Sequence, residues 1–311
     1  GKDTEGRPIQ AHGGGMLFHD GVYYWYGENK DTETLGIQMI RDNGEMGTSY
    51  RTNVIGVSCY SSTDLLHWRN EGLVLKASDE PGHDLHPDNV LERPKVVYHE
   101  ADRQFVMWMH VDTADYQYAR AGVATSDSPT GPFRYRGSVR PNGAMSRDMT
   151  LFRDDDGRAY LVFSSEENST MYVNLLSDDY LCPTTTYTRN LIGMYREAPA
   201  MWKQDGAYYL VTSGCTGWLP NRAETARADS PFGPWEPLGD PVEGEGAATT
   251  FDSQSTHVFR VEGLENAYIL MADRWKPQRL SDSRYIWVPL FLEAGRPVLR
   301  WADKWDLSVF Y

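Results

Sequence analysis

Five segments of the chain share one order of polar and hydrophobic positions. Each begins at an acidic or glycine turn and continues through about six apolar, β-prone residues, as a buried strand does. The segments are DGVYYWYGE (20–28), ADRQFVMWMH (101–110), DDGRAYLVFSS (155–165), DGAYYLVTSG (205–214) and LENAYILMADRW (264–275). A shorter strand pattern precedes each one across a tight turn, which predicts five β-hairpins.

A second hairpin pattern follows each of the first, so the chain reads as five units of four strands. This repeat predicts an all-β, five-bladed β-propeller that forms a single domain over residues 1–311. The blades are expected at roughly 9–80, 90–140, 146–190, 196–245 and 252–305. The polar segments 29–52 and 76–90 are predicted to be loops over one face. A β-sandwich also has short strands and turns, but it does not predict five ordered copies of one hairpin pair.

One position recurs nine residues before the turn of each first hairpin. It is occupied by His12, Glu92, Asp148, Glu197 and Gln254, with Ala101 in place of the turn glycine in the second unit. The innermost strands of a propeller run along its channel, so these side chains are expected to meet at one mouth. Three carboxylates facing one cavity are costly to bury unless function or a cation retains them. The alternative is that they cap strand ends.

Paired carboxyl groups in one cavity suit glycoside hydrolysis, which needs a protonated carboxyl group to donate to the leaving oxygen. Glu197 lies in the apolar context EAPAMW, which favours its protonated form. Asp148, one blade away, is the expected neighbour that raises the pKa of Glu197 and orients it.

The composition of the chain argues against several other classes of function. The net charge of −14 argues against nucleic acids and anionic membrane surfaces as partners. Three cysteines without a CxxC motif argue against a disulfide framework and a typical zinc site. No apolar run approaches the ~18 residues of a membrane span. Aromatic residues make up 13% of the chain, and a surplus of Trp and Tyr suits stacking on sugar rings as well as core packing.

The motifs IQAHGGG, YYWYGE, LERPKV, SRDMTLF, YREAPAMW and FDSQST resemble glycoside hydrolase family 43. They are most similar to its exo-β-1,3-galactanase branch, subfamily 24, and the resemblance extends from residue 5 to about residue 310. It implies a five-bladed propeller and a hydrolase that inverts the anomeric configuration, releasing galactose from β-1,3-galactan, the backbone of arabinogalactans. It also implies an extracellular or periplasmic location.

The resemblance implies Glu197 as general acid and Asp148 as the residue that tunes the pKa of that acid. The usual general base is a first-blade aspartate, which this chain replaces with His12, as the galactanase branch does. The base is then Gln254, which could orient the water or act as its imidic tautomer, or Glu92, an ordinary carboxylate and the better base on pKa grounds. The alternative role for Glu92 is contact with sugar hydroxyl groups. Residues implied to contact the sugar are Glu28, His12, Tyr116, Asn168, Thr216 and Trp218.

Two alternatives remain open for the activity: a family 43 α-L-arabinofuranosidase or β-xylosidase, and a sugar-binding propeller without catalysis. No organic cofactor and no metal are implied for catalysis. His257 is expected to reach the channel, where some relatives hold a calcium ion or a water network. Trp218 is either an exposed ring on a loop or part of a blade edge. Tyr116 and Tyr118 would share one face if they lie in a strand.

Overall fold

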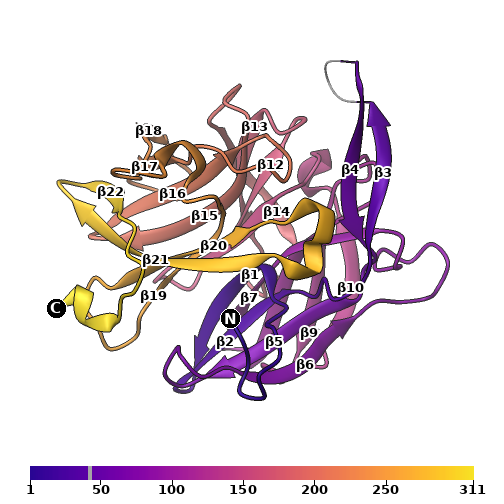
Figure 1. The fold of residues 1–311 in the computed structure, drawn as a ribbon, viewed down its shortest axis with the longest axis horizontal. Coiled ribbons are helices and arrows are strands. Elements are labelled where there is room, and N and C mark those ends of the chain that lie inside the picture. The colour runs from indigo at the N-terminus through magenta and orange to yellow at the C-terminus, as the bar shows by residue number, and fades with distance from the viewer. Residues whose placement is uncertain (41–43) are drawn as a thin grey trace.

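Five antiparallel four-stranded sheets surround a central axis, which confirms the predicted propeller (Figure 1). The computed structural model describes residues 1–40 and 44–311. The first blade contains β1 (His12–His19), β2 (Val22–Glu28), β5 (Gly56–Ser62) and β6 (Arg69–Lys76). The second contains β7 (Val90–His99), β8 (Gln104–Asp112), β9 (Arg120–Ser126) and β10 (Arg134–Val139).

The remaining three blades repeat this plan along the chain. The third contains β11 (Met149–Arg153), β12 (Ala159–Ser165), β13 (Thr170–Leu176) and β14 (Pro183–Asn190). The fourth contains β15 (Arg196–Gln204), β16 (Ala207–Gly214), β17 (Glu224–Ala228) and β18 (Glu236–Gly239). The fifth contains β19 (Gln254–Arg260), β20 (Tyr268–Arg274), β21 (Arg284–Glu293) and β22 (Arg296–Leu299).

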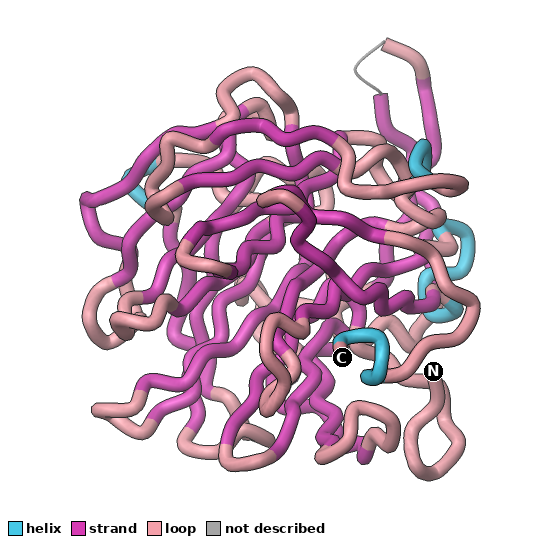
Figure 2. Tube along the Cα trace, turned by 90° about the vertical axis from the view of Figure 1, so that its left-hand side faces the viewer, coloured by secondary structure: helices cyan, strands magenta, loops and turns pink. Residues whose placement is uncertain are grey.

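Helical structure in the described residues is limited to short 3₁₀ turns between strands (Figure 2). They are η1 (Pro141–Gly143), η2 (Ala247–Thr249), η3 (Pro277–Asp282) and η4 (Leu307–Phe310). Within residues 1–40 and 44–311, no helix is long and apolar enough to cross a membrane.

The first strand of every blade is the innermost one. Strands β1, β7, β11, β15 and β19 contact one another in a closed ring around the channel. Buried apolar side chains fill the five interfaces between neighbouring blades, so each sheet is covered on both faces. This packing fixes where each inner strand begins, and therefore where the residues at its start are placed.

Glycines in the HGGG segment (12–15) allow β1 to approach its neighbours closely. A Cβ atom on Gly14 would lie 1.8 Å from the backbone oxygen of Tyr26, and one on Gly15 would lie 2.6 Å from the side chain of Lys95. Any larger residue at Gly14 would therefore push β1 away from β2.

The prediction for segment 29–52 was wrong, because much of it forms a hairpin and not a loop. Strands β3 (Thr34–Ile40) and β4 (Met46–Thr52) pair with each other and project from the body of the propeller (Figure 1). Leu35, Ile37 and Met39 alternate along the half-buried side of β3, a short period-two pattern that polar neighbours obscure. The predicted loop at 76–90 is confirmed as turns and irregular backbone.

Candidate active site

A cavity of about 550 Å³ lies at one mouth of the channel and collects most of the predicted site residues. Of those, its lining includes Glu92, Tyr116, Asp148, Asn168, Glu197, Trp218 and Gln254. Four of the five residues nine positions before a hairpin turn are therefore brought together, from four different blades.

A β-bulge follows two of these residues, Glu92 and Glu197. The pairing register shifts directly after Glu92 in β7 and after Glu197 in β15. The next residue has positive φ in both strands, 58° at Arg93 and 51° at Ala198. Non-glycine residues adopt this conformation only where the surrounding structure holds them, and such strain concentrates at functional sites.

Glu197 has the surroundings of a proton donor. Its Oε1 accepts a hydrogen bond of 3.0 Å from Asn168 Nδ2. Burial and the negative charge of Asp148 raise the pKa of Glu197 to about 8. Asp148 Oδ2 accepts a 3.0 Å hydrogen bond from the backbone nitrogen of Ala198, which fixes it beside the acid. Glu197 is thus protonated near neutral pH and can donate to a leaving oxygen.

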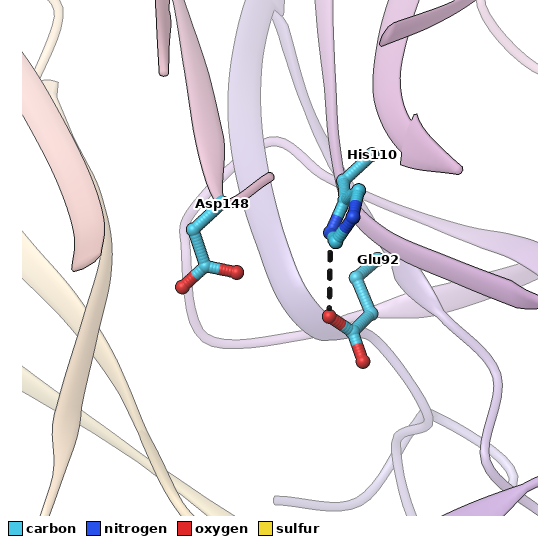
Figure 3. Close-up of side chains that lie close together, drawn as sticks. All are labelled: Glu92, His110 and Asp148. Carbon is cyan, nitrogen blue, oxygen red and sulfur yellow. Dashed lines mark ion pairs between the residues drawn. The ribbon is translucent and has the colours of Figure 1, made fainter. Parts of the chain in front are cut away.

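Glu92 has the opposite protonation state, although it lines the same cavity. Its Oε1 accepts a 2.6 Å hydrogen bond from the Tyr116 hydroxyl, and its Oε2 lies 3.5 Å from His110 Nδ1 (Figure 3). Burial raises the pKa of Glu92, but His110 and Tyr116 outweigh burial and bring the pKa down to about 2. The expectation that Glu92 is an ordinary carboxylate was wrong, since this low pKa makes it a weaker base.

His110 is a buried cation between two carboxylates. Its Nε2 lies 2.6 Å from Asp112 Oδ2. Burial lowers the pKa of His110, but Asp112 and Glu92 raise it to about 9. His110, Glu92 and Asp148 place one ligand atom each within 4.8 Å of one another, a spacing that a metal ion could use. Both ring nitrogens of His110 also lie beside carboxylates, Nδ1 beside Glu92 and Nε2 beside Asp112, so the residues form an ion-pair network.

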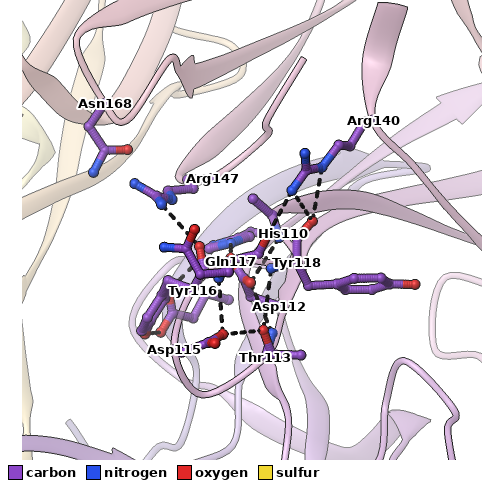
Figure 4. Close-up of polar contacts among 12 residues, drawn as sticks. His110, Asp112, Thr113, Asp115, Tyr116, Gln117, Tyr118, Arg140, Arg147 and Asn168 are labelled. Atoms are coloured by element: carbon purple, nitrogen blue, oxygen red, sulfur yellow. Dashed lines mark hydrogen bonds and ion pairs between the residues drawn. The ribbon is translucent and has the colours of Figure 1, made fainter. Parts of the chain in front are cut away.

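The loop after β8 positions Tyr116 (Figure 4). Asp112 Oδ1 accepts hydrogen bonds from the backbone nitrogens of Thr113 and Ala119, at 2.9 and 2.8 Å, and so closes the loop. Tyr116 and Tyr118 lie in this loop and not in a strand, so they do not share a face. The hydroxyl of Tyr118 instead donates to Asp84.

Gln254 has partners at both ends of its amide. Its Oε1 accepts hydrogen bonds from Arg93 Nη2 at 2.8 Å and from Trp275 Nε1 at 2.9 Å. Its Nε2 donates to Ser213 Oγ at 2.9 Å. Arg93 Nη2 also lies 3.3 Å from Asp148 Oδ2, so one guanidinium group connects the second, third and fifth blades.

Three predicted sugar contacts do not line the main cavity. His12 is fully buried, stacks on Tyr285 at 5.0 Å, and burial holds its pKa well below the usual value. Glu28 is buried behind the cavity, 3.0 Å from Lys30 Nζ, in a small adjacent pocket. Thr216 is exposed, and its hydroxyl donates to the backbone oxygen of Leu219.

Trp218 is neither a free ring nor a core residue. Its Nε1 donates to the backbone oxygen of Tyr50 in β4 at 2.9 Å, and its ring lies edge-on to Trp275 at 4.8 Å. It forms part of the cavity wall together with Met39 and Ile40 of the projecting hairpin. The loop of the fourth blade and the hairpin of the first therefore contact each other and both contribute to the cavity wall.

His257 lies beside Lys95 in the channel. The side chains of both residues lie next to Gly15, and burial together with Lys95 lowers the pKa of His257 to about 3. Lys95 Nζ donates to the backbone oxygen of Gly13 at 2.9 Å.

Sequence reasoning missed Arg93, His110 and Trp275, and the part that β3 and β4 play. Arg93 directly follows Glu92 in the LERPKV motif. The nine-residue spacing selects one residue in each blade and says nothing about the residue next to it. His110 could have been found from strand pairing, because it lies directly opposite Glu92 in β8. Trp275 comes just after β20, where nothing in the local pattern distinguishes it.

Comparison with known proteins agrees with this geometry. Residues 30–255 match the family described as glycosyl hydrolases family 43. The family 43 β-1,3-galactosidase BT3683, determined with galactodeoxynojirimycin, is 40% identical with a TM-score of 0.88, over 98% of both chains. The exo-β-1,3-galactanase of Phanerochaete chrysosporium, determined with galactose, is 35% identical with a TM-score of 0.84.

The alignment with the Phanerochaete enzyme covers 96% of this chain and 64% of that one, so this chain spans less than two thirds of its length. The β-D-galactofuranosidase xynD of Aspergillus niger is 26% identical over 76% of this chain and 72% of its own sequence. Family match, identity, coverage and fold agree, and the chain belongs to glycoside hydrolase family 43.

Proposed function

We propose that this protein is an exo-acting, inverting glycoside hydrolase that releases galactose from β-1,3-galactan. The observation that carries the proposal is Glu197, a carboxyl group with a pKa of about 8 in a cavity that it shares with Asp148. Similarity to a β-1,3-galactosidase and to an exo-β-1,3-galactanase over nearly the whole chain supports galactose as the sugar released.

The reaction follows from the protonation states in the cavity. Glu197 donates its proton to the glycosidic oxygen as the bond from that oxygen to the anomeric carbon breaks. A water molecule attacks the anomeric carbon from the opposite face, which inverts the configuration, and its proton passes to the general base, for which Gln254 and Glu92 are the candidates. Asp148 keeps the Glu197 proton in place until the bond breaks, because a second negative charge beside it is unfavourable. Glu197 is left as a carboxylate and regains a proton from solvent.

The other polar groups suit recognition of one terminal sugar. Glu92 accepts from Tyr116 and, as a carboxylate, has lone pairs for sugar hydroxyl groups. Asn168 donates to Glu197 and also lines the cavity. The walls formed by Trp218 and the β3–β4 hairpin favour a chain end over the middle of a polymer, which supports exo action. A polysaccharide substrate of this kind also favours an extracellular or periplasmic location.

Product analysis tests the proposal. The protein is incubated with unbranched β-1,3-galactan, and separately with arabinan and with xylan. We expect free galactose as the sole early product from galactan. Release of arabinose or xylose instead would contradict the substrate, and no release from any of the three would favour a sugar-binding propeller. A Glu197→Gln variant should still bind galactan oligosaccharides without cleaving them.

A further inference from the structure

We propose that a groove on the outer edge of the fifth blade is a second carbohydrate-binding site, which holds a stretch of the β-1,3-galactan chain outside the catalytic cavity. The groove has a volume of about 550 Å³ and lies between the first half of β21 and the segment 301–305. None of its lining residues lines the catalytic cavity. The inference rests on the proposed function for the identity of the sugar, whereas the groove itself indicates a carbohydrate.

The groove forms because the outer strand of blade five is short. β22 pairs only with the end of β21, from Leu290 to Glu293. The earlier part of β21 pairs with β20 on its inner side, and no strand among the described residues pairs with its outer side. The segment after β22 passes beside this open edge, and Trp301 and Trp305 from that segment line the groove.

Trp301 is an exposed ring that is held in a fixed position. It is 43% exposed, although three neighbours contact it. The guanidinium group of Arg274 lies 4.9 Å from the ring centre, and the ring of Phe251 lies at 5.4 Å. The indole Nε1 donates to Asp303 Oδ1 at 2.8 Å. A ring that is already ordered loses little conformational freedom on binding, and an indole face suits the C–H face of a sugar ring.

Polar groups with unused hydrogen-bonding capacity flank this ring. Arg274 donates from Nε to the backbone oxygen of Phe251 at 2.9 Å, and its two Nη atoms have no acceptor among the described residues. Asp303 uses one carboxylate oxygen for Trp301. Lys304 is exposed and also lines the groove. Donors and an acceptor beside an aromatic face match a sugar, whose hydroxyl groups both donate and accept.

The open edge of β21 is blocked against a peptide strand. A strand that adds to a sheet edge needs the N–H and C=O groups of alternate residues along that edge. Trp305 Nε1 already donates to the backbone oxygen of Trp287 at 3.0 Å. Pro289, two residues further along the same edge, has no N–H. The groove therefore favours a ligand that binds to side chains, as a carbohydrate does, over one that extends the sheet.

Arg274 connects the groove to the segment that leads into the catalytic cavity. It is the last residue of β20, and its hydrogen bond to Phe251 lies three residues before Gln254, the first residue of β19. Gln254 lines the catalytic cavity. A polymer held in the groove stays on the surface of the same blade, so the local concentration of its chain ends near the cavity rises.

Binding of galactan to an inactive protein tests the site directly. The Glu197→Gln protein is titrated with long, unbranched β-1,3-galactan, with and without Trp301→Ala. Loss of the ring should weaken polymer binding about 5- to 15-fold, as expected for one aromatic contact. Binding of free galactose should stay within about twofold, since the groove and the catalytic cavity share no lining residue. Equal polymer affinity with and without the Trp301 ring would overturn the proposal.

Tyr187→Ala is the matched control, and Asp303→Ala is a second variant of the groove. Tyr187 is a 40% exposed ring in β14 of blade three, and its loss should change polymer binding by less than about twofold. Asp303 is exposed, so its replacement leaves the core intact, and polymer binding should weaken about 2- to 5-fold. Unchanged binding in Asp303→Ala, or an effect of Tyr187→Ala as large as that of Trp301→Ala, would contradict a dedicated site.

The length of the substrate separates the groove from the catalytic cavity in kinetics. With the native acid in place, Trp301→Ala should raise KM on long galactan about 5-fold and leave kcat within about twofold. KM on a β-1,3-linked galactose disaccharide should not change, because a disaccharide bound in the cavity has no part left for the groove. An equal rise in KM on both substrates would show that Trp301 acts through the catalytic cavity and would overturn the proposal.

The same measurements distinguish failure of this site from failure of the proposed function. Binding of galactan that depends on Trp301, in a protein that releases no galactose, would refute the proposed function and leave the groove as a carbohydrate site. Release of galactose together with polymer binding that does not depend on Trp301 would refute the groove alone. A change in the molar mass of the protein in solution on Trp301→Ala, without a change in galactan binding, would assign the groove to a second copy of this chain and overturn the proposal.

Discussion

The cavity that contains Glu197 and the cavity at the opposite mouth of the channel are formed by the same inner strands. They have similar volumes, about 550 and about 430 Å³. The opposite mouth is lined by several basic side chains, and Lys203 there pairs with Asp154 and the exposed Asp155. At the Glu197 mouth, two partly buried carboxyl groups, Glu197 and Glu92, have pKa values of about 8 and about 2 within one cavity.

The difference shows that cavity size does not identify the site in this fold. Lys203 and Asp155 form an ion pair at the solvent-exposed surface. Such a pair contributes at most about 1 kcal/mol to stability. Glu197 and Glu92 are held in different protonation states by burial and by their neighbours, which is the property that acid–base chemistry needs. Four predictions test this contrast.

The largest effect is expected for Glu197→Gln. The amide has the size of the acid but no proton to donate, so we expect kcat on galactan to fall about 10²- to 10⁴-fold. Binding of galactan oligosaccharides, measured by calorimetry, should remain within a few fold. Substantial residual turnover would place the proton donor elsewhere.

Asp148→Asn should lower activity and move its pH dependence. Burial and the charge of Asp148 raise the pKa of Glu197, so removing that charge lowers this pKa from about 8. Because the protonated form is active, the alkaline limb of kcat/KM should move to lower pH, with a fall in kcat of about 10- to 100-fold. An unchanged alkaline limb in the pH–rate profile would show that Asp148 does not tune the acid.

His110→Gln should lower the free energy of unfolding, and the size of this loss should depend on pH. The pKa of His110 is about 9 in the folded protein and ~6.5 when unfolded. Its stabilisation is therefore complete below about pH 6.5 and disappears as pH rises through 9, with a size of about 3 kcal/mol. Urea unfolding of the native protein should show this decline between pH 6 and 10, and the variant should lack it. A parallel decline in both proteins would assign it to other groups.

The smallest effect is expected at the opposite mouth. Asp155→Asn removes one partner of Lys203 at the surface, so the free energy of unfolding should change by less than about 1 kcal/mol. Galactose release should be unchanged. A loss of activity comparable to that of Asp148→Asn would mean that the two mouths are coupled, which would contradict the contrast between them.

Much of this arrangement could be predicted from the sequence, because the strand pattern and the position of the active-site residue recur in each of the five units. The aromatic strand pattern identifies five blades, and a fixed distance from each turn identifies Glu92, Asp148, Glu197 and Gln254. The same spacing also selects His12, but His12 does not line the cavity. The aromatic side chain of Tyr285 and the packing of blades one and five cover it.

What the sequence could not predict depends on contacts between blades. Arg93 reaches Gln254 across 161 positions of the chain, and Trp218 reaches the hairpin across 168. No local pattern encodes such pairs. The low pKa of Glu92 likewise depends on His110 and Tyr116, which only strand pairing and loop closure bring to it.

The central claim is that Glu197 protonates the leaving oxygen while water attacks from the opposite face. Proton NMR of the first turnovers on the methyl glycoside of a β-1,3-linked galactose disaccharide tests it most directly, because only the cleaved unit is released as free galactose and its two anomers give separate signals. The account predicts that α-galactose appears first and then equilibrates with the β-anomer. If β-galactose appears first, the reaction retains configuration, and direct attack of water on the face opposite Glu197 would be wrong.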